Sequence, residues 1–237
     1  MTSAAVLAAV VTLSAWPSHL TLAPGTQAIV TVQAATRDRL QVDARVAGYT
    51  LDLHGRPQLA GQAAGRPLLT VSPHRVIVAH AGTTLVVSAP PAPRGARAGD
   101  HSAAVLITAT APAAHGIPVR MRVGIAVTVR VPGRVVRRLV IRALHVQRRG
   151  RHRLVELTLA NRGNVIEAIR GTRLTLVLRR RGRVLARLRA GPQLLLPRTN
   201  GIVVVRYDGP TRGRVTAQPV LRGAGAPAIA RRFPLRL

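Results

Sequence analysis

Alternation of apolar and polar residues dominates the chain. The longest run is Val119–Val131, in which every odd position is apolar and the even positions are arginine, glycine, alanine or threonine. Further alternating runs occupy residues 40–46, 139–146, 154–159, 173–178, 184–188 and 202–207. Successive side chains of a strand point to opposite faces, so these runs predict β-strands with one buried face. Helical spacing of apolar residues is almost absent, and the pattern therefore predicts an all-β protein.

Turn-forming segments rich in Gly, Pro and Asn separate these runs, as at residues 23–26, 161–164 and 208–210. Many short strands at regular spacing are typical of β-sandwiches. The longest run closes at Val131, Pro132-Gly133 follows, and a new set of strands begins at Val135. We therefore predict two tandem β-sandwiches, at residues 17–133 and 134–222, followed by a basic, loosely ordered tail at residues 223–237.

The amino-terminal segment resembles an export signal. Residues 4–13 form an apolar run of the right length, and Ser14 and Ala15 are small residues before Trp16. We therefore predict a signal peptide at residues 1–16 and an extracytoplasmic location, secreted or in the cell envelope. The missing arginine before the run and Leu13 near the cleavage site count against this, and a buried first strand or helix is the alternative. The apolar run is too short to span a bilayer and no other segment qualifies, so no transmembrane anchor is predicted.

Positive charge is concentrated in the second half. Residues 1–133 contain 11 Arg and four Asp, whereas residues 134–237 contain 25 Arg, one Asp and two Glu, and the chain has no lysine. Two clusters surround the glycines of predicted hairpin turns at Gly150 and Gly182. The clusters are Arg148, Arg149, Arg151 and Arg153, and Arg179, Arg180, Arg181 and Arg183. Such basic tips favour the binding of polyanions. Aromatic residues make up only 2% of the chain, which disfavours the stacking platforms of nucleic-acid-binding proteins.

Catalytic constellations are weak. Residues 99–102 read Gly-Asp-His-Ser, but neighbouring residues of a strand point to opposite faces and cannot form a triad. Glu156 and Glu167 are a pair of carboxylates from different predicted strands, and structural ion pairing with arginine is the favoured reading. The chain has no cysteine, no phosphate-binding loop and no histidine pair with metal-ligand spacing. We predict a protein that is not an enzyme and that has no cofactor or metal site.

Three segments together resemble a known family: LTLAPGTQAIVTVQ; LTVSPHRVIVAHAGTTLVVSAPPAPRGARAGDHSAAVLIT with VRMRVGIAVTVRV; and ELTLANRGNV. They resemble the two-domain immunoglobulin-like proteins of bacterial envelopes, related to pilus-assembly chaperones and WxL-interacting surface proteins. The resemblance implies two immunoglobulin-like sandwiches, the first similar to the chaperone amino-terminal domain. It also implies adhesion, wall attachment or capture of a partner's strand. Pilus chaperones grip a carboxylate with a basic pair, which no motif assigns here, although Arg120, Arg122 and Arg130 lie on the matching strand.

These observations lead to a functional prediction. We expect a non-catalytic secreted or cell-envelope protein of binding or structural type, whose arginine hairpins hold anionic wall or surface polymers. An open strand edge would add the strand of a secreted protein partner. The residues of that edge are Val119, Met121, Val123, Ile125 and Val127. Two alternatives remain: a periplasmic-type assembly chaperone that captures a partner β-strand, and a non-specific nucleic-acid-binding protein.

Overall fold

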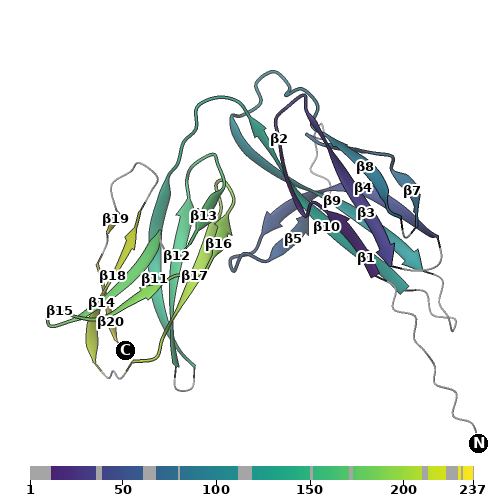
Figure 1. Cartoon of the computed structure of the whole chain (residues 1–237). Helices are drawn as coiled ribbons and strands as arrows, with labels where there is room; N and C mark the ends of the chain where they lie inside the picture. The colour runs from purple at the N-terminus through teal and green to yellow at the C-terminus, as the bar shows by residue number, and fades with distance from the viewer. Residues whose placement is uncertain are drawn as a thin grey trace, which may run out of the picture. The chain divides into compact units, whose positions relative to one another are not determined.

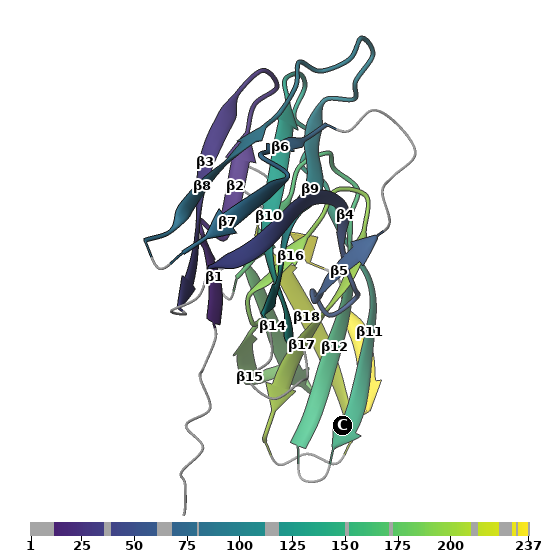
Figure 2. The same ribbon diagram turned by 90° about the vertical axis from the view of Figure 1, so that its right-hand side faces the viewer.

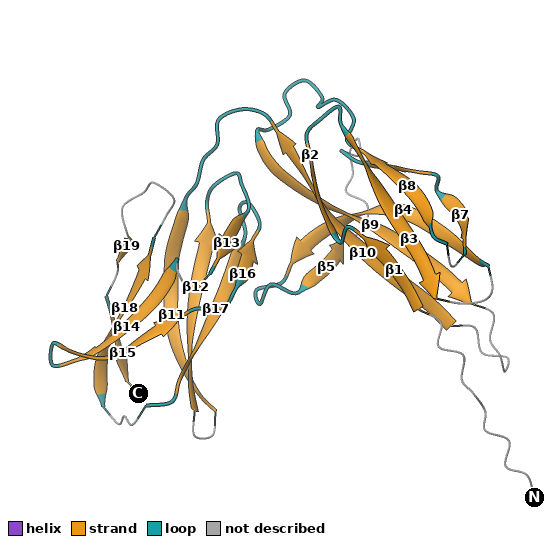
Figure 3. Ribbon diagram, viewed as in Figure 1, coloured by secondary structure: helices purple, strands orange, loops and turns teal. Residues whose placement is uncertain are grey.

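The computed structural model describes residues 12–35, 39–60, 68–79, 81–111, 119–149, 152–170, 173–209, 213–222, 229–230 and 232–236. All regular structure among them is β-strand, as Figure 3 shows, and the all-β prediction is confirmed. In the described part of the chain there is no helix long and apolar enough to cross a membrane. The chain forms two compact units: Met1–Thr50 with Leu59–Gly133, and Leu51–Gln58 with Arg134–Leu237.

The first unit is a sandwich of two sheets (Figure 1). The strands of these sheets are β1 (Thr12–Trp16), β2 (His19–Leu22), β3 (Gln27–Ala35), β4 (Leu40–Leu51), β5 (Pro57–Ala60), β6 (Thr70–Ser72), β7 (Arg75–Val78), β8 (Thr83–Ser88), β9 (Gly99–Ala111) and β10 (Val119–Val131). The last residue of β4 and the first two of β5 fall within Leu51–Gln58, which is counted with the second unit. One sheet has the order β1-β3-β8-β6, and the other has the order β2-β10-β9-β4-β5 with β7 beside β4. The inward side chains of both sheets form one aliphatic core, which includes Leu40, Leu85, Ile107 and Ile125.

The second unit has its own core and three sheets. Several of its strands, among them β11, β12 and β17, are labelled in the turned view of Figure 2. Its strands are β11 (Leu139–Arg149), β12 (His152–Asn161), β13 (Glu167–Ile169), β14 (Leu174–Arg180), β15 (Arg183–Arg189), β16 (Gln193–Leu195), β17 (Asn200–Tyr207), β18 (Arg214–Leu221), β19 (Ile229–Ala230) and β20 (Phe233–Arg236). The orders are β11-β12-β17, β13-β16, and β15-β14-β18-β19 with β20 also on β18.

Both ends of the described chain add strands where the sequence predicted other features. Thr12–Trp16, within the predicted signal peptide, form β1, and Leu13 and Ala15 pack against the first core. Residues 1–11 lie outside the described part of the chain. In the described residues of the tail that was predicted to be loosely ordered, β19 and β20 both pair with β18 and Phe233 packs on the second core. The alternation of Phe233–Arg236 is too short to be distinguished from a loop in the sequence.

Candidate functional site

Strand β10 is paired along its whole length on one side only. Its partner there is β9, antiparallel, from Val119 opposite Ala111 to Val131 opposite Gly99. On the other side β2 runs parallel to β10 and covers only Ala126 to Val129. The chain reaches this position from the other sheet, because β1 pairs with β3 up to Trp16 and the chain then crosses to β2 at His19. Among the described residues, nothing pairs with the free side of β10 from Val119 to Ile125; we call this stretch the open edge.

The backbone groups on the open edge come from the even-numbered residues. The Ala126 N–H donates to the Ser18 carbonyl oxygen at 3.1 Å, so the backbone of Ala126 points toward β2. In a strand the N–H and C=O of one residue point to the same side, and this side alternates from residue to residue. The N–H and C=O groups of Arg120, Arg122 and Gly124 therefore point to the open edge. The N–H and C=O groups of the odd-numbered residues point toward β9.

The odd residues of β10 supply an apolar face that runs beyond the core. Ile125 and the odd residues after it are buried, with Ile125 fully buried. Met121 and Val123 are half-buried, and Val119 is 54% exposed. The alternation is uniform along the strand, but the core covers only its second half. The open edge therefore carries unpaired backbone groups beside partly uncovered apolar side chains.

The edge strand of the opposite sheet, β1, contacts β10, and both strands are labelled in Figures 1 and 2. β1 pairs with β3 on one side, and it ends the order of its sheet on the other. Its last residue, Trp16, is 75% exposed.

The outer face of β10 is basic. Arg120 and Arg122 are exposed, and by register they lie beside Thr110 and Thr108 of β9. Arg130 is different, because its Nε donates to Asp100 Oδ1 at 2.7 Å and its Nη2 donates to Asp100 Oδ2 at 3.1 Å. These hydrogen bonds to a buried carboxylate raise the pKa of Arg130 above its ordinary value. Arg130 is therefore ion-paired within the fold, whereas no ion pair is formed by Arg120 or Arg122 among the described residues.

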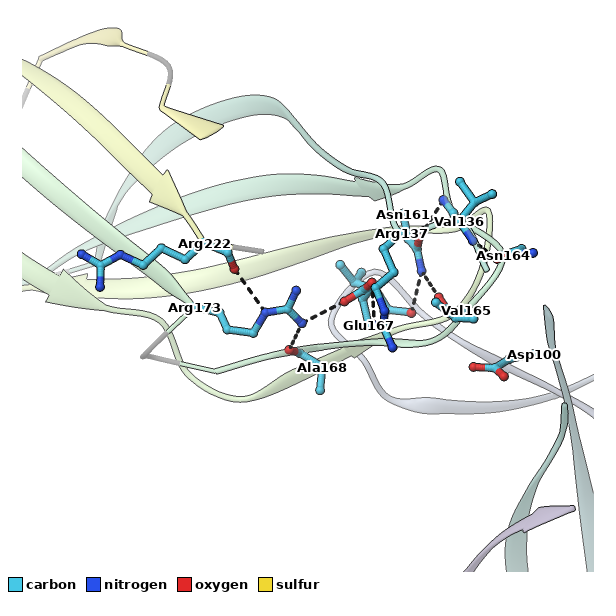
Figure 4. A network of polar contacts seen from close by, with 12 residues as sticks. Asp100, Val136, Arg137, Asn161, Asn164, Val165, Glu167, Ala168, Arg173 and Arg222 are labelled. Atoms are coloured by element: carbon cyan, nitrogen blue, oxygen red, sulfur yellow. Dashed lines mark hydrogen bonds and ion pairs between the residues drawn. The ribbon is translucent and has the colours of Figure 1, made fainter. Parts of the chain in front are cut away.

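Of the residues weighed for catalysis, the side chains of Asp100, His101 and Glu167 have partners within the fold. Asp100 and His101 both lie in β9. Asp100 accepts a hydrogen bond from Arg130, and the Nε2 of His101 lies 2.7 Å from the Arg97 carbonyl oxygen. Glu167 is buried in β13, between Arg137 and Arg173, as Figure 4 shows. Glu156 lies in β12, a strand of a different sheet, opposite Val204. The two glutamates are thus not brought together on one strand pair, and ion pairing accounts for Glu167. No cluster of three or more metal-ligating residues occurs in the described part of the chain.

The predicted arginine hairpins belong to two different sheets. Arg148 and Arg149 end β11 and Arg153 follows in β12, while Arg151 lies outside the described residues. Arg179 and Arg180 end β14 and Arg183 begins β15. The turn between them has Arg181 and Gly182 at positive φ, and the Arg179 Nη1 donates to the Gly182 carbonyl oxygen at 3.0 Å. The hairpin prediction agrees with these strands; the role of the individual arginines as polyanion ligands stays a prediction.

Comparison with solved structures places the fold. A chain from the structure of a chaperone–tip adhesin complex of CFA/I fimbriae biogenesis matches with a TM-score of 0.56 and 12% identity, covering 93% of this chain and 98% of that one. The class 5 fimbriae chaperone CfaA matches with a TM-score of 0.53 and 13% identity, covering 94% and 100%. The fold is that of the pilus-assembly chaperones. The predicted pair of immunoglobulin-like sandwiches and the resemblance to these chaperones are confirmed. No protein-family model and no curated protein sequence matches the chain.

The main functional prediction is corrected by this comparison. A binding or structural protein for anionic envelope polymers was expected, but the structures that share the fold over nearly the whole chain are those of fimbrial chaperones. They favour the assembly-chaperone alternative.

The sequence predicted a partner-binding edge at Val119, Met121, Val123, Ile125 and Val127. The first four lie along the stretch of β10 that is not paired toward β2, whereas Val127 is opposite Leu20 of β2. That these residues bind a partner strand stays a prediction. The backbone groups of the even residues, Gly124 among them, were missed. Gly124 could have been noticed in the sequence, because it is the only glycine of the alternating run and contributes no side chain to either face.

Proposed function

We propose that this chain is an extracytoplasmic assembly chaperone that captures an extended segment of a protein partner on the open edge of β10. The observation that carries the proposal is the pairing of β10, which is complete toward β9 but stops at Ala126 toward β2. The chaperone fold supports it. The activity is binding by strand addition, in which main-chain hydrogen bonds supply affinity and alternate side chains supply selectivity.

Each part of the edge has a role in this proposal. The backbone groups of Arg120, Arg122 and Gly124 pair with the incoming segment. The apolar side chains of Val119, Met121 and Val123 pack against its inward residues, which hides apolar surface from water on both partners.

Gly124 permits a direct test, because its N–H points to the open edge and not to β9. A side chain at this position has room: a Cβ would lie 3.7 Å from Leu106 Cδ2, an ordinary contact. Gly124→Pro therefore removes one edge donor and keeps the pairing with β9, and proline is tolerated at such edge positions. Val123→Pro, by contrast, removes a donor to β9 and should unfold the strand.

The probe is the peptide Thr-Val-Gln-Val-Gln-Val-Thr, capped at both ends and labelled for fluorescence anisotropy. Gly124→Pro should weaken its binding about 5- to 150-fold, because a lost backbone hydrogen bond that leaves its partner unpaired costs about 1–3 kcal/mol. Gly124→Ala is the matched control, since it adds a side chain but keeps the N–H, and it should bind as wild type does. Equal binding by the proline and alanine variants, or no binding of the peptide to wild type, would refute the proposal.

A further inference from the structure

Two arginines project from the outer face of the open edge. Arg120 and Arg122 are both exposed, are two residues apart on β10, and have Gly124 as the next even residue. We call these two residues the edge arginines. Neither makes an ion pair or a side-chain hydrogen bond among the described residues. They flank the backbone groups that an added strand would meet.

The described part of the first unit contains no unpaired carboxylate that could bind the edge arginines. Its two described carboxylates, Asp43 and Asp100, are ion-paired with Arg75 and Arg130 at 2.9 and 2.7 Å. Two like charges on neighbouring positions of one strand face repel each other, and no described carboxylate is ion-paired with either edge arginine. Acidic groups of a partner placed beside the edge arginines would relieve this repulsion.

We infer that the captured segment carries acidic side chains at two positions, two residues apart, beside the edge arginines. This rests on the proposed function. Side chains of neighbouring strands interact on one face when they are directly opposite or diagonal, and opposite charges there stabilise the pair. Because the edge arginines are at positions i and i+2 of a strand, their partners are also at positions j and j+2, whether the added strand is parallel or antiparallel.

The inner face of the segment follows from the same register. The residues between the two acidic positions point to the other face, where they meet Val119, Met121 and Val123. The segment is therefore an extended stretch in which apolar residues alternate with aspartate or glutamate.

The experiment compares three capped heptapeptides on the full-length protein by fluorescence anisotropy at low salt: Thr-Val-Glu-Val-Glu-Val-Thr, Thr-Val-Gln-Val-Gln-Val-Thr and Thr-Val-Lys-Val-Lys-Val-Thr. Capping removes any terminal carboxylate. The glutamate peptide should bind roughly two- to thirtyfold tighter than the glutamine peptide, from two cross-strand charge pairs. The lysine peptide should bind more weakly than the glutamine peptide. The differences should shrink in 0.5 M salt, where the Debye length falls to about 4 Å.

The chain has a formal charge of +29, so a matched control must separate local pairing from general attraction. Arg120→Gln with Arg122→Gln should abolish the preference for glutamate over glutamine. Arg187→Gln with Arg189→Gln makes the same charge change at two exposed positions two residues apart on β15, and it should leave the preference intact.

The outcomes distinguish this inference from the proposed function. If the glutamine peptide binds, and Gly124→Pro weakens it, but the glutamate peptide binds no tighter, the charge inference is wrong and strand capture stands. A glutamate preference that survives in the variant of the edge arginines also overturns the inference, since the overall charge then explains it. If none of the three peptides binds, both proposals fail.

Discussion

Replacing Glu167 with alanine should destabilise the second unit strongly. The Glu167 side chain is 1% exposed and accepts hydrogen bonds from Arg137 Nη1 at 3.1 Å and Arg173 Nη1 at 2.8 Å. Removing one partner of a buried ion pair costs about 3–5 kcal/mol, because the remaining charge is left unpaired. The two arginine side chains are 47% and 25% exposed and can be partly rehydrated, which places the cost near the lower limit, at about 3 kcal/mol.

The contacts around this ion pair show which arginine matters more (Figure 4). Besides Glu167, Arg173 donates to the carbonyl oxygens of Ala168 at 3.0 Å and Arg222 at 3.3 Å. Arg173 therefore ties β13 to the end of β18, whereas Arg137 is half exposed and bound through Glu167. Most of the cost should come from the Arg173 side of the network.

Differential scanning calorimetry measures this effect. For a unit of about 100 residues, 3 kcal/mol lowers the Tm by roughly 12–24 °C. The control is Asp43→Ala, which breaks an ion pair whose side chains are 70% and 57% exposed and should lower the Tm of the first unit far less. The reasoning would be wrong if the two variants lowered the Tm of their own units by the same amount. Burial would then not be the reason why the Glu167 ion pair stabilises the second unit.

Two further changes test local features of the second unit. The hydrogen bond from Arg206 holds the pKa of Asp208 below its ordinary value, so the stabilisation by this carboxylate is present above the unfolded-state pKa and is lost as the pH falls through the lower folded-state value. Arg206→Gln should raise the midpoint of the Asp208 carboxyl titration followed by NMR, and an unchanged midpoint would contradict the assignment. Gly163→Ala should cost about 1–3 kcal/mol in urea unfolding, because a Cβ there would overlap the Val136 carbonyl oxygen. Gly191→Ala is its control, since a Cβ at Gly191 has nothing within 4 Å, and equal stability of the two variants would refute the argument.

The turn that contains Gly163 shows why some features were hidden in the sequence. The Asn164 side chain binds the segment before β11 on both sides, accepting from the Val136 N–H at 2.7 Å and donating to the Arg134 carbonyl oxygen at 2.8 Å. Asn161, fully buried, donates to the carbonyl oxygens of Val165 and Leu195. The sequence predicts a turn at this place from its Asn and Gly residues. It contains no signal for the distant backbone groups that these side chains bind.

Local pattern determined the strands and their two faces. The strand predicted at Val119–Val131 has the same bounds as β10. An extended backbone has a period of two residues, so the alternation of apolar and polar residues reveals the strand directly. The turns at Gly133 and Gly182 could likewise be predicted, since positive φ favours glycine. The all-β class and the bounds and two faces of β10 were thus accessible from the sequence by itself.

Tertiary structure decided where that strand is open. The core covers Ile125 but not Val119, although both belong to one uniform run, because coverage depends on which strands lie opposite. The edge begins where β2 ends its pairing at Ala126, and that depends on the crossing of the chain from β1 to β2, some hundred residues earlier. Pairing between distant segments leaves no periodic trace in either of them. The sequence therefore determined the strand and its faces, and the fold alone determined which backbone groups remain available to a partner.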